Sequence, residues 1–151
     1  MRRALYVLLI LSIVLVSCTV STNTSAVSEE SEVRSVVEDF GRRIQAVPLQ
    51  SPHVLEEMRE RYTELVSPEL LQKWVGDISQ APGRIVSSPW PDRIEITSVV
   101  EETSDKYLVT GYVAEVTSVE VVSGGAANKI PVRITVEKAE GRWMITEYTQ
   151  Q

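Results

Sequence analysis

Apolar and polar residues follow two different periods along this chain, and the change of period separates a helical part from a strand part. Between residues 29 and 47, apolar residues recur at steps of three and four, which places them on one face of a helix. They are Val33, Val36, Val37, Phe40, Ile44 and Val47. Ser28 can cap the start of this segment and Pro48 ends it. The pattern therefore predicts an amphipathic helix that begins at Glu29.

Two shorter helices are predicted after Pro48, each introduced by a serine followed by a proline. Ser51-Pro52 and Ser67-Pro68 both place a capping hydroxyl in front of a proline at the first helical position. The residues expected to face the core from these two helices are Leu55, Met58, Tyr62, Leu65, Leu70, Leu71, Trp74, Val75 and Ile78. We expect the third helix to stop at Pro82-Gly83.

Beyond Asp92 the period becomes two, which is typical of strands. The predicted strands are 93–100, a long run from Lys106 to Val122, 130–136, and a last strand from Arg142 to Thr149. Gly111 is a plausible bend or bulge in the long run. Helices followed by strands with short turns predict an α+β fold, in which N-terminal helices pack on a mostly antiparallel four-stranded sheet.

The first residues have the pattern of a secretory signal. Arg2 and Arg3 precede an apolar stretch from Ala4 to Val16, whose 13 residues are fewer than the roughly 20 of a membrane-spanning helix. The stretch leads into Leu15-Val16-Ser17-Cys18, which resembles the lipobox of bacterial lipoproteins. This resemblance implies cleavage before Cys18, attachment of lipid such as palmitate to Cys18, and a membrane-anchored protein on the extracytoplasmic face of the cell membrane.

We therefore expect a signal peptide at 1–17, the lipidated Cys18 with a flexible polar tether through residue 28, and a single α+β domain at 29–151. The whole chain has 15 Lys and Arg residues; without Arg2 and Arg3 the mature domain carries 13 against 21 acidic residues, a net charge of −8. This charge disfavours nucleic acid as a partner and an anionic bilayer as a docking surface.

The order of the elements is similar to that of the nuclear transport factor 2-like superfamily, the cystatin-like α+β roll. The likeness rests on an amphipathic helix, a helical pair ending in YTELVSPELLQKW and long strands finishing in GRWMITEY, and it covers about Val33 to Tyr148. It implies a curved sheet around the helices, often with a conical pocket, and leaves a homodimer through the outer face of the sheet open. Members include isomerases, dehydratases, binding modules and assembly proteins, so the fold does not fix the function.

Few residues could carry chemistry. His53, the single histidine, lies in a first helical turn, where side chains normally face solvent. An acid–base role would need a carboxylate inside the concavity of the sheet; Glu115 or Glu120 is a candidate for one such role, and Asp39 is a weaker one. The sequence has no phosphate-binding loop, no nucleophile elbow and no converging set of metal ligands. We expect no catalytic residue, no metal and no cofactor.

Aromatic residues are the candidates for contact with a ligand or a partner. Trp90 lies between two prolines, so it is either a stiff contact residue or a plug at one end of the core. The other candidates, each a core residue or part of a pocket lining, are Trp74, Trp143, Tyr62, Tyr107 and Tyr112.

Taken together, these features predict a non-catalytic interaction or accessory module of the cell envelope, held by lipid and contacting an unknown envelope protein. One alternative is the binding of a small apolar ligand in the concavity of the sheet; a second is an isomerase-like or dehydratase-like enzyme. A ligand carrier requires a deep apolar pocket and an enzyme also requires a buried carboxylate in it. An interaction module requires a filled core and an exposed patch.

Overall fold

The computed structural model of the chain describes the backbone of residues 22–151 and the side chains from residue 28 onward. The elements are α1 (Thr22–Ile44), α2 (Val54–Tyr62), α3 (Pro68–Gly76), the 3₁₀ helix η1 (Ile78–Gln80), β1 (Trp90–Thr103), β2 (Lys106–Val116), α4 (Ser118–Ser123), β3 (Asn128–Ala139) and β4 (Arg142–Gln150). The predicted signal peptide and Cys18 lie outside the described residues.

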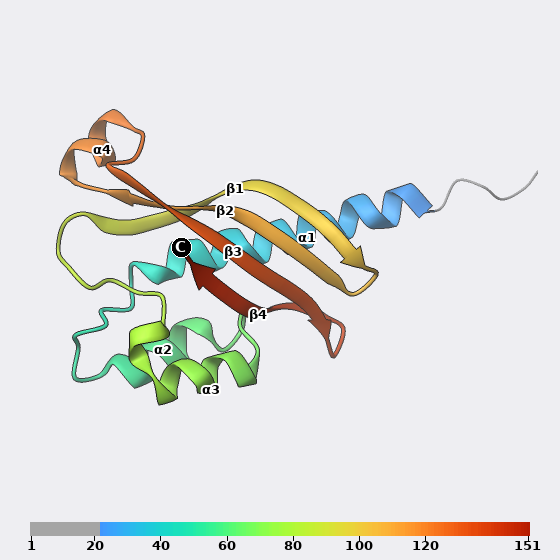
Figure 1. The fold of residues 1–151 in the computed structure, drawn as a ribbon, viewed down its shortest axis with the longest axis horizontal. Helices are drawn as coiled ribbons and strands as arrows, with labels where there is room; N and C mark the ends of the chain where they lie inside the picture. Colours follow the sequence, from blue (N-terminus) through green and yellow to red (C-terminus); the bar gives the residue numbers. More distant parts are fainter. Residues whose placement is uncertain (1–21) are drawn as a thin grey trace, which may run out of the picture.

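The four strands form one antiparallel sheet in chain order, β1-β2-β3-β4. Helix α1 crosses one face of this curved sheet, and α2 and α3 lie together beside β4 (Figure 1). The segment from Leu65 to Ser67 adds backbone hydrogen bonds to Ile145 at the β4 edge. Helices packed on an antiparallel four-stranded sheet confirm the predicted α+β class.

Helix α1 uses the apolar face that its periodicity predicts. Val33, Val37, Phe40 and Ile44 are all buried in the core. The helix begins at Thr22 rather than at Glu29, so residues 22–28, which we expected in the flexible tether, are helical. Extending a helix by a turn requires much less free energy than nucleating one, and this favours a longer helix than the apolar pattern alone indicates.

The two Ser-Pro pairs behave differently. The Ser67 hydroxyl accepts a hydrogen bond from the backbone N–H of Leu70 at 3.2 Å, and Pro68 is the first residue of α3, as predicted. Ser51 does not cap α2, because its hydroxyl accepts instead from the N–H of His53, two residues along, and α2 begins only at Val54. Helix α3 also ends earlier than predicted, at Gly76, and the separate 3₁₀ turn η1 follows.

One of the three register shifts between β1 and β2 lies opposite Gly111 rather than at it. The register between β1 and β2 shifts between Ile96 and Ser98, so the extra residue belongs to β1. A Cβ atom on Gly111 would lie 2.3 Å from the carbonyl oxygen of Glu95. The glycine is needed because the backbone of the bulged strand approaches it closely.

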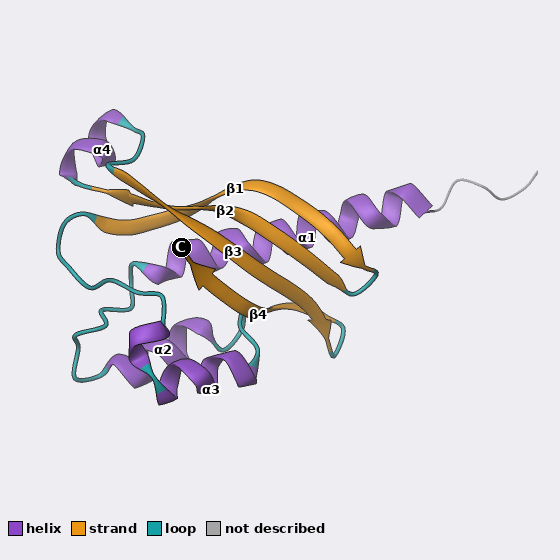
Figure 2. Cartoon of the chain, in the orientation of Figure 1, coloured by secondary structure: helices purple, strands orange, loops and turns teal. Residues whose placement is uncertain are grey.

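The predicted long strand is wrong beyond Val116, where the chain turns into helix α4 (Figure 2). Thr117 and Glu120 form a capping box: the Thr117 hydroxyl accepts from the N–H of Val119, and the Glu120 carboxylate accepts from the N–H of Thr117 at 2.9 Å. Valine-rich composition favours a strand, but the reciprocal cap stabilises a helix start. The two middle strands are therefore joined by a helix instead of a tight turn.

Candidate functional site

Aromatic side chains fill the space between the sheet and the helices. Phe40, Tyr62, Trp74 and Tyr148 pack as one cluster, with ring centroids 5.1 to 6.1 Å apart. Trp74 is 1% exposed and Tyr62 is fully buried. Two of the residues that could have lined a pocket are therefore core residues, and their rings occupy the volume that a ligand would need.

The hydroxyl group of Tyr62 also has a structural partner. It donates a hydrogen bond of 2.8 Å to the carbonyl oxygen of Pro82, which lies in the loop leading to β1. Burial, and secondarily the neighbouring Tyr148, raises the pKa of Tyr62 above its usual range. The hydroxyl therefore remains a neutral donor that fixes the loop to the helical pair.

Tyr107 and Trp143 close the other end of the core. Their ring centroids are 5.2 Å apart in an edge-to-face arrangement, and both side chains are buried. The Lys138 ammonium lies 5.2 Å from the centre of the Trp143 ring and forms an ion pair with Glu29 of α1 at 2.8 Å. This cation–π contact and ion pair fasten the β3–β4 hairpin to the helix.

Trp90 and Tyr112 are the two predicted contact residues that stay outside the core. Trp90 begins β1, pairs with Val116 and is half-buried. Tyr112 is 37% exposed on the face of the sheet that points away from α1. A contact role for Trp90 stays a prediction.

Two hollows in the described part of the chain lie away from the concavity. One, of about 240 Å³, is between α2 and α3 and is floored by Val66, Leu71 and Val75. The other, of about 210 Å³, is on the outer face of the sheet beside Tyr112 and Arg133. Neither is a deep apolar pocket between the sheet and α1, which is the kind of site that the ligand-binding alternative requires.

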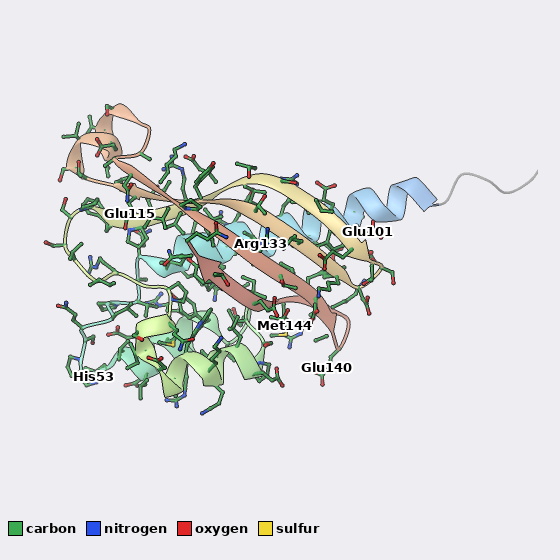
Figure 3. The ribbon with its side chains drawn as sticks, viewed as in Figure 1. His53, Glu101, Glu115, Arg133, Glu140 and Met144 are labelled. Carbon is green, nitrogen blue, oxygen red and sulfur yellow. The ribbon has the colours of Figure 1, made fainter. Side chains whose placement is uncertain are left out.

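The acidic and histidine candidates do not converge on a site. Glu115 accepts a hydrogen bond of 2.8 Å from Asn128, Glu120 belongs to the cap of α4, and Asp39 forms an ion pair with Arg42. His53 is exposed before α2 (Figure 3). The predicted strand does not include Glu120, because β2 ends at Val116 and Glu120 lies in helix α4. Within residues 28–151, no three His, Cys, Asp or Glu side chains are placed to hold a metal ion.

Most of the exposed large apolar side chains belong to two segments at the same end of the molecule (Figure 1). Of seven large apolar side chains exposed in the described part of the chain, five come from α4 and the loop before β1. They are Ile85, Val86, Val119, Val121 and Val122, with exposed fractions of 62%, 52%, 66%, 63% and 89%. We call this set the apolar end.

The apolar end lies far from the start of α1. In Figure 1, α4 and the loop before β1 occupy one end of the long axis, and the first turns of α1 occupy the other. The apolar pattern of the sequence does not reveal this surface, because it places Val119, Val121 and Val122 in a strand. The usable signal was the Thr117-x-x-Glu120 spacing, which marks a helix start.

Ion pairs stiffen the strands that support the apolar end. Glu95 of β1 forms ion pairs with Arg93 and with Lys129 of β3, and a guanidinium N–H of Arg93 donates to the carbonyl oxygen of Gly125 at 3.0 Å. Lys129 first, and then Arg93, lowers the pKa of Glu95 against the opposing effect of burial. These contacts connect β1 to the segment that follows α4.

Comparisons with known proteins give distant likenesses of fold. No protein-family model matches the chain, and no curated protein matches it. The chain is similar to the crystal structure of the intermembrane space region of the chloroplast protein ARC6, with 14% identity and a TM-score of 0.42 over 82% of this chain and 94% of that one. It is also similar to a designed protein of the nuclear transport factor 2-like kind, with 12% identity and a TM-score of 0.40 over 85% of this chain and 100% of that one.

Proposed function

We propose that this protein is a lipid-anchored, extracytoplasmic module of the cell envelope that contacts a partner protein through its apolar end. The domain is nuclear transport factor 2-like in this proposal, and Cys18 carries the lipid. The observation that carries the interaction role is the exposure of Val119, Val121 and Val122 on a helix that a capping box holds in place. Clustered apolar side chains exposed to water mark surfaces that other molecules cover.

The filled core supports an interaction role over a carrier role. Trp74, Tyr62 and Phe40 occupy the space in front of the sheet, so a ligand would have to displace large aromatic side chains. Such a cavity would forfeit several kcal/mol of packing, about 3–5 for each large aromatic side chain removed. The carboxylates that could have served an enzyme there are engaged elsewhere.

The position of the apolar end favours a protein partner over the membrane that holds the lipid. Helix α1 has 23 residues and is therefore about 35 Å long. A lipid attached ahead of its first residue would lie at the end of the molecule opposite α4 (Figure 1). The net charge of −8 on the mature domain, which repels an anionic bilayer surface, acts in the same direction. Within residues 22–151, no helix has the length and hydropathy needed to cross a membrane.

The anchor is tested by replacing the cysteine. We expect Cys18→Ala to abolish incorporation of an alkyne-labelled palmitate and to move the protein out of the membrane fraction. Retention of the lipid label in the variant would contradict the anchor. The unchanged chain, labelled in parallel, is the reference for both readouts.

The interaction role is tested with the full-length chain in its own membrane. The wild-type protein should form a defined complex on native gels of neutral-detergent extracts, and the double substitution Val119→Ser with Val122→Ser should abolish it. The matched control is Val100→Ser, because Val100 is a valine 51% exposed on β1, outside the apolar end. A complex that survives the double substitution, or that Val100→Ser removes equally well, would contradict a role for the apolar end.

A further inference from the structure

The hollow on the outer face of the sheet contains a basic side chain with no partner in the described part of the chain. Besides backbone, the hollow of about 210 Å³ is lined by Thr97, Thr110, Tyr112, Pro131, Arg133 and Gln151. Arg133 lies over the middle of the sheet, on the face turned toward the viewer (Figure 3). This surface is separate from the apolar end.

Arg133 differs from the other basic residues of β1 to β3. Arg93, Lys106, Lys129 and Lys138 each form at least one ion pair with an acidic side chain. Arg133 is exposed and forms neither an ion pair nor a side-chain hydrogen bond within residues 28–151. A guanidinium group presents five N–H donors in a planar fork that matches a carboxylate. The guanidinium group of Arg133 is therefore available to bind a carboxylate.

The neighbours of Arg133 add hydroxyl groups and a flat apolar surface. The strand register places Arg133 between Thr110 of β2 and Thr149 of β4. Two residues along β2 on the same face, Tyr112 pairs with Pro131. The Thr110 hydroxyl lies 3.4 Å from the Thr97 hydroxyl, so Thr149 supplies the hydroxyl donor beside a carboxylate on Arg133. A ring attached to that carboxylate would reach Tyr112 and Pro131.

Acidic side chains near the hollow are already engaged. Glu95 is paired with Arg93 and Lys129, and Glu147 accepts a hydrogen bond of 2.9 Å from Thr135. The net negative charge of the domain acts against an anion over longer range, although salt screens it beyond about 10 Å. The guanidinium of Arg133 favours a carboxylate, whereas the net charge of the domain opposes any anion. We therefore expect binding that is selective for carboxylates but weak.

We propose that this hollow is a binding site for a small acidic ligand, namely a carboxylate carried on a flat ring. The carboxylate pairs with Arg133 and the ring lies against Tyr112. Because an exposed ion pair contributes little free energy, the dissociation constant falls in the millimolar range. The ligand is either a free aromatic acid or the carboxyl end of a polypeptide that finishes in an aromatic residue, and both share this chemistry.

The test uses the full-length chain in a neutral detergent, with benzoate as the probe and benzamide as its uncharged match. The nitrogen-15 resonance of the Arg133 side chain, identified by its loss in Arg133→Gln, should shift and saturate with benzoate and stay unmoved with benzamide. The resonance of Arg142, an exposed arginine on β4 that has no ion pair within residues 28–151, is the internal control. An unmoved Arg133 resonance, or equal shifts of both arginines, overturns the proposal.

Variants test the two halves of the site. Tyr112→Ala should weaken benzoate binding several-fold while Tyr112→Phe retains it, because the ring rather than the hydroxyl carries the stacking contact. Equal affinity in Tyr112→Ala would overturn the ring contact. A peptide ending in phenylalanine with a free carboxylate should bind, and its amide should not. If the peptide acid binds more tightly than benzoate, a polypeptide end is the source; if it binds more weakly, a free acid is.

Discussion

Tyr107 and Tyr112 lie an odd number of residues apart on β2, so their side chains point to opposite faces of the sheet. Tyr107 is buried against Trp143, whereas Tyr112 is 37% exposed beside Arg133. Strand alternation thus separates a core residue from a surface residue of the same type. For a single residue, the sequence predicts which face of the sheet the side chain occupies. It does not predict whether other side chains pack against that face.

Tyr62 gives a prediction at alkaline pH. Because burial raises its pKa in the folded state above the ordinary value of 10.0, its contribution to stability is full below pH 10 and is lost as pH rises further. Tyr62→Phe should lower the free energy of unfolding by about 1 kcal/mol at neutral pH, through loss of the bond to Pro82. It should also reduce the loss of stability above pH 10. Urea unfolding at both pH values measures this.

The control for Tyr62→Phe is the same substitution at a partly exposed tyrosine. Tyr112→Phe should leave the free energy of unfolding at neutral pH unchanged, because the Tyr112 side chain is 37% exposed. If Tyr62→Phe loses stability above pH 10 as steeply as the wild-type protein, the burial of this hydroxyl does not govern the alkaline behaviour.

Gly111 gives a second prediction for a single residue. The Cβ atom of alanine there would lie 2.3 Å from the Glu95 carbonyl oxygen, so Gly111→Ala should lower the free energy of unfolding by about 1–3 kcal/mol. Gly76→Ala is the matched control, since no atom lies within 4 Å of its Cβ position, and it should be neutral or slightly stabilising. Equal effects of the two substitutions in chemical unfolding would contradict the close approach of β1 to β2.

At the scale of elements, predictions succeed where one local signal acts alone. The apolar stripe of α1 and the Ser67 cap of α3 appear as predicted. The boundary of β2 was wrong because valines favour a strand while Thr117 and Glu120 favour a helix start. The strand preference of the valines and the helix preference of the cap conflict there, and in the structure the segment is helical.

The capping box of α4 predicts a local effect of substitution. Thr117→Ala removes the acceptor for the Val119 N–H and should destabilise this six-residue helix by about 0.5–2 kcal/mol. The amide protons of α4 should then exchange faster with deuterium, while those of β3 keep their protection. Ser118→Ala is the control, because the neighbouring serine forms no side-chain bond within residues 28–151. Unchanged exchange in Thr117→Ala would show that the cap does not hold α4.

At the scale of the whole molecule, the fold gathers exposed apolar residues at one end and places the beginning of the described chain at the other (Figure 1). The two segments of the apolar end are more than 30 residues apart in the sequence. Local periodicity cannot relate such segments, since only the strand order brings them to the same end. The class of fold was therefore predictable from the sequence, and this candidate site was not.

The proposed anchor and the shape of the domain together predict where a partner would lie. Lipid at Cys18 would hold one end near the membrane, and α1 would carry the other end about 35 Å away. A partner at that distance would meet the apolar end, formed by α4 and the loop before β1 (Figure 1). The proposed acidic-ligand site on the outer face of the sheet could be occupied at the same time.

The most direct measurement is photo-cross-linking in living cells, with a photoreactive amino acid placed at Val122 or, separately, at Glu101. Val122 is 89% exposed at the apolar end, and Glu101 lies on β1 near its turn into β2 (Figure 3). We expect one defined protein adduct at Val122 that disappears in a Thr117→Ala background, and no such adduct at Glu101. The same adduct at both positions, or none at Val122, would contradict the interaction role of the apolar end.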